Sequence, residues 1–133
     1  MSERRVPERS ASGFVNRLRS FGYALQGLGF MLRTQQNAWL HLGATLIVVV
    51  AAWLLGVGRD DWRWLIVAIV AVWVAETFNT AVEYLCNVVS PGYSEAVRRA
   101  KDIGASAVLI AALGAVVIGS VTLWPYLVFV VRR

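Results

Sequence analysis

Two long apolar runs constrain this chain more than any other feature of its sequence. They cover residues 42–58 and 103–123, carry no charged side chain, and each approaches the roughly 20 residues that a helix needs to cross a bilayer. Of the 133 residues, 58% are hydrophobic and 16% are charged. This composition predicts an all-α integral membrane protein and excludes a two-domain enzyme or a disordered chain.

The segment before the first run has the pattern of a helix that lies on a membrane surface. Residues 1–12 are polar and basic and are predicted to be flexible. Over residues 13–35, apolar side chains recur every three or four positions and line one side of a helix. We interpret this amphipathic surface helix either as a simple membrane anchor or as an anchor that also covers an active site. Its apolar stripe consists of Phe14, Leu18, Phe21, Leu25, Leu28 and Leu32.

Turn-forming residues divide the rest of the chain into three predicted transmembrane helices. Glycines and charges separate the first two spans, and the Ser-Pro-Gly sequence at 90–92 separates the second from the third. We expect the Ser94 hydroxyl to cap the third span and Pro125 to end it. With the surface helix, the spans form a single domain over residues 13–131. The predicted spans are 38–57, 62–89 and 94–124.

The distribution of Lys and Arg predicts the orientation of the spans. Six lie in the N-terminal segment and three in the loop at 90–102, which fall on one side of the membrane, while four lie on the other side. Because basic residues flank spans mainly on the cytoplasmic side, we predict a cytoplasmic N-terminus and a cytoplasmic loop at 90–102.

A stripe of small residues on the third span predicts close helix packing. Ala107, Ala111, Ala115 and Gly119 recur every four residues, and small side chains allow membrane helices to approach closely. We expect this stripe to mediate oligomerisation, with contact inside one chain as the alternative.

Four polar side chains form a ladder on one face of the second span. Glu76, Asn79, Glu83 and Asn87 follow steps of three and four residues and therefore share a helix face. An ionised carboxylate inside an apolar span costs about 2.5–3.5 kcal/mol on insertion scales. Polar groups can simply hold helices together, but two carboxylates on one face repel unless a cation or proton lies between them. We therefore interpret this polar ladder as a functional site.

Lys101 and Asp102, one loop away on the same predicted side, supply complementary chemistry. Lys101 can neutralise a phosphate, and Asp102 can hold Lys101 or the water shell of a metal. Carboxylates for a divalent cation, a lysine for phosphate and a base at the membrane edge are what phosphoryl transfer to a lipid hydroxyl requires. A small proton-coupled transporter that uses Glu76 as its membrane carboxylate is an alternative from another class.

Two single residues are expected to have structural roles only. His41, the one histidine of the chain, stands at the entrance of the first span, where an interfacial hydrogen-bonding role is commoner than metal ligation. Cys86, the one cysteine, cannot form an internal disulfide and is expected to be small helix surface.

At the polar ladder the sequence resembles the prokaryotic diacylglycerol kinase family, which includes the undecaprenol kinases. Residues 76–83, E-T-F-N-T-A-V-E, are similar to the family motif E-x-x-N-[ST]-A-[IV]-E. Lys101 and Asp102, followed by small residues, are similar to its K-D segment. Asn37-Ala38 with His41 is similar to the entrance sequence of the undecaprenol-type members. The resemblance covers about residues 13–124, most of the chain.

The resemblance implies an ATP- and magnesium-dependent lipid kinase of phospholipid or cell-envelope lipid recycling. It further implies a multi-pass protein of the bacterial plasma membrane and a homotrimer with cytoplasmic sites shared between subunits. Because the basic residues lie beside apolar spans, no nucleic acid partner is expected. Glu76 would be the general base that deprotonates diacylglycerol or undecaprenol, with Ala105 beside the lipid. Glu83 and Gln35 would bind magnesium. The residues implied for the nucleotide are Tyr23, Gln35, Asn79, Glu83, Gly92, Tyr93, Ser94, Lys101 and Asp102.

Three positions depart from the family pattern, and each loses a charge. Gln35 stands where a glutamate is expected, Trp39 where an arginine is usual, and Asn87 where an aspartate is usual. A glutamine oxygen can ligate magnesium, but without the Coulomb attraction of an anion. The alternative is therefore a weakened or non-catalytic member that still binds lipid or nucleotide.

Overall fold

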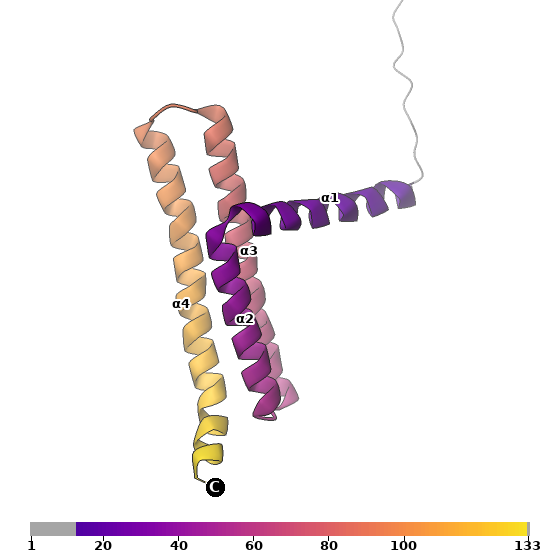
Figure 1. The fold of residues 1–133 in the computed structure, drawn as a ribbon, viewed down its shortest axis with the longest axis vertical. Coiled ribbons are helices and arrows are strands. Elements are labelled where there is room, and N and C mark those ends of the chain that lie inside the picture. Colours follow the sequence, from indigo (N-terminus) through magenta and orange to yellow (C-terminus); the bar gives the residue numbers. More distant parts are fainter. Residues whose placement is uncertain (1–12, 133) are drawn as a thin grey trace, which may run out of the picture.

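The computed structural model describes residues 13–132, which form four helices and no strand (Figure 1). The predicted flexible segment 1–12 and the side chain of Phe14 lie outside what is described. Three of the helices are long and apolar enough to cross a membrane, which confirms the all-helical prediction and its number of candidate spans. The helices are α1 (Gly13–Thr34), α2 (Gln36–Leu54), α3 (Arg59–Val89) and α4 (Glu95–Val131).

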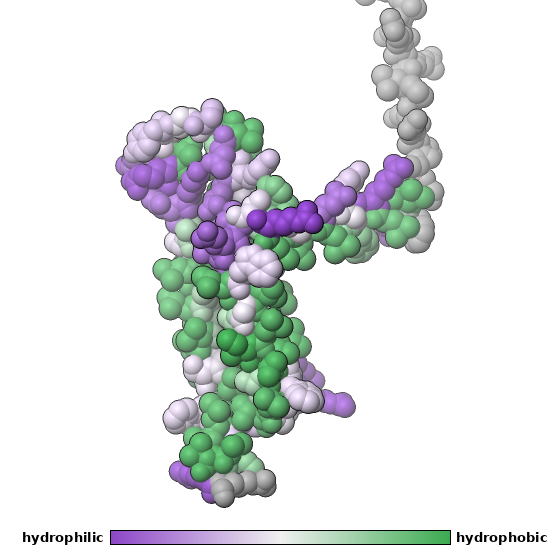
Figure 2. Space-filling view, in the orientation of Figure 1, coloured by the Kyte–Doolittle hydropathy of each residue, from purple (hydrophilic) through white to green (hydrophobic). Residues whose placement is uncertain are grey.

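Helix α1 projects sideways from the end of α2, whereas α2, α3 and α4 run alongside one another (Figure 1). The hydrophobic side of α1 is turned toward the level at which the other helices are apolar. Its hydrophilic side is turned toward the polar end of the molecule (Figure 2). Of the stripe residues that the structure describes, Leu18, Phe21, Leu25 and Leu28 are exposed and Leu32 is partly buried. A lone chain leaves most of this stripe uncovered, as is expected of a helix that lies on a membrane surface.

Helix α2 packs on α3 through side chains spaced three and four residues apart. Ala38 and Ala52 are fully buried on this face, and Val48 contacts the small core near the far end. Between them, the Trp73 indole of α3 donates a hydrogen bond of 3.1 Å to the Thr45 hydroxyl. This face also carries His41 and thereby directs it toward α3.

The turn between α2 and α3 is held against α4. Gly56 takes a left-handed backbone conformation, with φ of 66°, which ends α2 before residue 57. The Tyr126 hydroxyl accepts a hydrogen bond of 3.0 Å from the Gly58 amide and donates one of 2.6 Å to Asp61. Beside it lies a small apolar core formed by Ala52, Val57 and Leu65.

Some predicted helix ends are wrong. Pro125 does not end the third span, because α4 continues through it to Val131. A proline removes a single backbone donor, which a membrane helix tolerates. The next residue, Tyr126, fixes this part of α4 to the α2–α3 turn. Ser94 does precede α4, but its hydroxyl makes no capping hydrogen bond. Helix α2 runs over 36–54 instead of 38–57, and α3 begins at Arg59 instead of 62.

Helices α3 and α4 are longer than a bilayer requires. At 31 and 37 residues, they measure about 46 and 55 Å, against about 30 Å for the hydrocarbon core. Both extend past the α1–α2 junction, where hydrophilic side chains gather (Figures 1 and 2). We call this extension, residues 83–102, the polar head.

Candidate active site

The polar ladder of α3 runs from the buried interior of the helix bundle into the polar head. Glu76 is 1% exposed and Asn79 is 6% exposed. Glu83 is half-buried and Asn87 is exposed. The ladder therefore connects a buried end at Glu76 to a solvent-exposed end at Asn87.

Glu83 lies at the centre of the ladder between two side-chain amides. Gln35 Nε2 donates to its Oε2 over 3.2 Å, and Asn79 Nδ2 donates to its Oε1 over 3.1 Å. Gln35 is the single residue between α1 and α2 and has an extended backbone, so the helix junction itself delivers this side chain to α3. The structure thus brings together three predicted site residues from two distant segments.

Glu76 lies deeper, where it faces His41 of α2. His41 Nε2 is 3.6 Å from Glu76 Oε2, and this oxygen is buried without a hydrogen-bond partner among the described residues. One turn on, the Thr80 hydroxyl bonds the backbone carbonyl of Glu76, not its carboxylate, over 2.9 Å. The predicted general base is therefore enclosed by protein instead of facing acyl chains.

Helix α4 meets the ladder at Gly104. A Cβ atom at this position would lie 2.6 Å from Asn79 Oδ1, a distance that side chains do not tolerate without movement. Asn79 Oδ1 is itself buried and has no hydrogen-bond partner in the described structure. Glycine at 104 is thus what allows α4 to approach the buried part of the ladder.

Lys101 lies at the outer end of the ladder. Its Nζ donates a hydrogen bond of 2.7 Å to Asn87 Oδ1, and Asn87 is one turn, about 6 Å along the helix axis, beyond Glu83. Asp102 does not hold Lys101, contrary to one expectation, but accepts a hydrogen bond of 2.8 Å from Arg98. Consecutive helical residues point about 100° apart, so Lys101 faces α3 while Asp102 faces the exposed side of α4.

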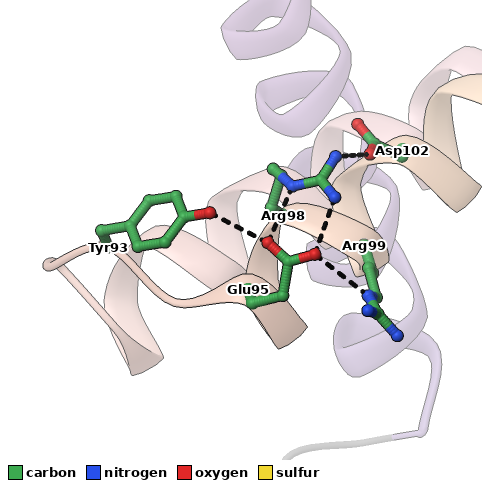
Figure 3. A network of polar contacts seen from close by, with 5 residues as sticks. All are labelled: Tyr93, Glu95, Arg98, Arg99 and Asp102. Carbon is green, nitrogen blue, oxygen red and sulfur yellow. Dashed lines mark hydrogen bonds and ion pairs between the residues drawn. The ribbon is translucent and has the colours of Figure 1, made fainter.

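A charged network holds the turn before α4 to its first two helical turns (Figure 3). Glu95 accepts hydrogen bonds from the Tyr93 hydroxyl and from Arg98 and Arg99, over 2.7–3.2 Å. Arg98 bridges Glu95 to Asp102. These groups are exposed, so solvent screens their attraction. Tyr93 is directed toward Glu95 by this network.

Other predicted site residues lie away from the ladder face. Tyr23 lines a groove between α1 and α3, together with Thr80 and Tyr84 on the neighbouring face of α3. Gly92 and Ala105 are exposed, and Ser94 is partly buried in the turn before α4.

Sequence reasoning gave no site role to His41 or Gly104. The spacing of Ala38, His41 and Thr45 places His41 on the packed face of α2, and this spacing was the available signal. For Gly104, the signal was a glycine three residues after Lys101, at the start of an apolar run.

The fold and the site define a helical membrane protein with a carboxylate- and lysine-bearing polar site near one end of its spans. The chain belongs to the prokaryotic diacylglycerol kinase family, whose model matches residues 22–123. Members of this family are ATP-dependent lipid kinases of membranes. The resemblance read from the ladder motif is thereby confirmed.

Individual relatives carry two kinase names. A diacylglycerol kinase of Synechocystis sp. is 36% identical over 111 residues, which cover 83% of this chain and 63% of that protein. The diacylglycerol kinase of Escherichia coli is 31% identical over 125 residues, covering 88% and 96%. An undecaprenol kinase of Bacillus subtilis is 27% identical over 109 residues, covering 82% and 89%. These relatives share the lipid kinase class but differ in the lipid.

Proposed function

We propose that this chain transfers the γ-phosphate of ATP to the hydroxyl of a lipid alcohol at the cytoplasmic edge of the membrane. The observation that carries the proposal is the ladder itself. Glu76 is buried at one end, Glu83 lies in the middle, and Lys101 donates a hydrogen bond to Asn87 at the outer end. A base and an anion for a metal lie along one face of α3, and Lys101 of α4 adds a cation for phosphate at the outer end of that face. Phosphoryl transfer depends on such positioning and charge stabilisation.

In this proposal Glu76 takes the proton of the lipid hydroxyl, and Ala105, exposed on α4 away from the ladder, contacts another part of the lipid. Glu83 and Gln35 hold the magnesium ion, which when bound neutralises charge on the ATP phosphates. The carboxylate of Glu83 suits this ion, because magnesium in phosphate sites uses one or two carboxylates together with phosphate and water oxygens. Gln35 would ligate it by turning its amide, since its Nε2 now faces Glu83. Lys101 binds the phosphates. The nucleotide contacts are completed by Asn79 and Asp102 and, nearer the surface, by Tyr23, Gly92, Tyr93 and Ser94.

The same proposal includes a cytoplasmic site and a homotrimer. Helix α1 and the first turns of α4, with most of the described Lys and Arg residues, lie toward the same end of the molecule (Figure 1), which supports a cytoplasmic polar head. On α4, Ala115 and Gly119 line an open groove facing α2. A Cβ atom at Gly119 would meet nothing within 4 Å. The stripe begins at Ala107, which is exposed outside this groove, and small side chains there leave room for a helix of a second chain while the groove stays open.

The function is tested by offering purified protein γ-labelled ATP together with diacylglycerol in one set of vesicles and undecaprenol in another. We expect magnesium-dependent labelling of one lipid, and the labelled product identifies the substrate. A chelator provides the matched control, because it removes the divalent cation while leaving protein, lipid and ATP unchanged. If neither lipid is labelled although the folded protein binds ATP, the chain is the non-catalytic family member that the departures from the family pattern suggest.

Substituting Gln35→Glu distinguishes a weakened kinase from a non-catalytic member. The new carboxylate would face Glu83, where the Gln35 amide now donates its hydrogen bond, and two facing carboxylates attract a divalent cation. We expect the magnesium concentration for half-maximal transfer to fall about tenfold, equivalent to about 1.4 kcal/mol. The measurement is a magnesium titration of transfer rate at fixed ATP.

The neighbouring substitution Gln36→Glu is the control for Gln35→Glu. Gln36 is exposed at the start of α2, so the substitution Gln36→Glu adds the same charge at a position that does not face Glu83. Equal titration curves for Gln35→Glu and the unsubstituted protein would remove Gln35 from the proposed metal site.

A further inference from the structure

Glu76 is held in surroundings that its proposed role as a base does not by itself explain. The side chain is 1% exposed, and its Oε2 has no hydrogen-bond partner among the described residues. Burying a carboxylate without a partner is costly, and the group then becomes neutral unless a cation or donor lies beside it. A neutral Glu76 could not accept a proton.

The group nearest to this oxygen is the imidazole of His41. Its Nε2 is 3.6 Å from Glu76 Oε2, so a shift of about half an ångström gives an ordinary hydrogen bond. His41 is 18% exposed, far more than its partner. Its ring also lines a groove of about 490 Å³ between α2, α3 and α4, which leaves it accessible.

The packing of α2 fixes this imidazole in place. Ala38 is fully buried one turn before it, and Thr45 is bonded to Trp73 one turn after it. The charged or titratable groups that act on Glu76 are His41 from α2 and Glu83 from α3 itself. Helix α4 presents Gly104, which has no side chain, to the adjacent turn of the ladder. His41 is therefore the group placed to offset the burial of Glu76 in the described chain.

We propose that His41 is the positioning residue for Glu76 in lipid phosphorylation: its Nε2–H holds Oε2 and leaves Oε1 free for the lipid hydroxyl. This inference rests on the proposed kinase function. In the reaction step, the hydroxyl proton moves to Oε1 of Glu76, the lipid oxygen forms a bond to the γ-phosphorus, and the bond from that phosphorus to the bridging oxygen of ADP breaks. His41 keeps its own proton throughout and acts through Glu76.

The contact can be tested without any activity measurement, because the chain contains a single histidine. Protein labelled with ¹⁵N only in histidine gives ring signals from His41 alone. We expect Glu76→Gln to shift these signals and Asp61→Asn, at the opposite end of α3, to leave them unchanged. Unchanged signals in the Glu76→Gln protein would overturn the inference, whether or not the chain is a kinase.

The positioning role is then tested by kinetics. We expect His41→Ala to lower kcat on the order of 10- to 100-fold, as loss of an orienting partner commonly does, while KM for ATP and for lipid stays within about twofold. Free imidazole should restore part of the lost rate, since it can enter the groove. The variant His41→Gln keeps an N–H donor, so its kcat should lie between those of the unsubstituted protein and His41→Ala. It keeps the test valid if the alanine variant misfolds.

The control is Ser120→Ala, which changes another residue lining the same groove. Its kcat should equal that of the unsubstituted protein, and free imidazole should not raise it. A kcat unaffected by His41→Ala, or a loss with raised KM and no imidazole rescue, would overturn the positioning role. If the unsubstituted protein labels no lipid, the proposed function fails instead, and a retained ¹⁵N response would identify the His41–Glu76 contact as purely structural.

Discussion

Replacing Glu76 with glutamine is expected to reduce phosphate transfer from ATP to lipid about 100- to 10,000-fold, the range that general base catalysis contributes. Glutamine has nearly the same shape but cannot accept the proton of the hydroxyl. The buried position makes the effect sharp, because at 1% exposure water has little access to replace the missing base. The measurement is labelled lipid formed per minute by purified protein in vesicles.

The Glu76→Gln protein should remain folded and assembled. The substitution replaces a buried carboxylate with a neutral amide of nearly the same shape, whose oxygen can face His41 as Oε2 of Glu76 does. Asp60→Asn is the matched control, because it also converts a carboxylate to an amide but at an exposed position near the far turn. Undiminished transfer by Glu76→Gln would reject the role of Glu76, whereas equal losses in both variants would indicate a general effect of charge.

The three candidate spans were predictable because membrane insertion depends on quantities that sequence states directly, namely length, hydropathy and charge. Helix ends were less predictable. Pro125 lies inside α4, and the next residue, Tyr126, is anchored to the α2–α3 turn, a tertiary contact that no local rule contains. The end of α2, by contrast, follows a local rule, because Gly56 adopts the left-handed conformation just after this helix.

Spacing also placed the ladder residues on one face of α3, but it could not say which helix each would meet. Glu76 meets α2, Asn79 meets α4, and Glu83 meets Gln35 from 48 residues away. These pairings depend on how the helices are rotated about their axes, and periodicity leaves that rotation undetermined. The expected Lys101–Asp102 pair failed for a different reason, because consecutive residues of one helix point about 100° apart whatever the rotation of that helix.

The replacements at Gln35 and Asn87 agree with their surroundings. Gln35 donates an N–H to Glu83, and Asn87 accepts one from Lys101. Each amide therefore satisfies a charged partner without contributing a charge of its own. A site with fewer negative charges needs no resident cation to hold it together, at the cost of a weaker attraction for magnesium.

Gly104→Ala is expected to destabilise the protein by about 1–3 kcal/mol, the usual cost of overpacking a tight contact, and to slow phosphate transfer. The new methyl group would lie 2.6 Å from Asn79 Oδ1 and must displace either α4 or that side chain. Asn79 also donates to Glu83, so the disturbance reaches the proposed metal site. Thermal unfolding in detergent and the transfer assay measure the two effects.

Gly114→Ala on the same helix separates this close approach from general effects of glycine replacement. A Cβ atom at Gly114 would meet nothing within 4 Å, and alanine favours a helix over glycine by about 1 kcal/mol. The Gly114 variant should therefore be as stable as the unsubstituted protein or more so. Because both substitutions add one methyl group to α4, a similar loss in both would mean that α4 itself is sensitive. A loss confined to Gly104→Ala would mean that the contact between α4 and the ladder holds Asn79 and Glu83 in place.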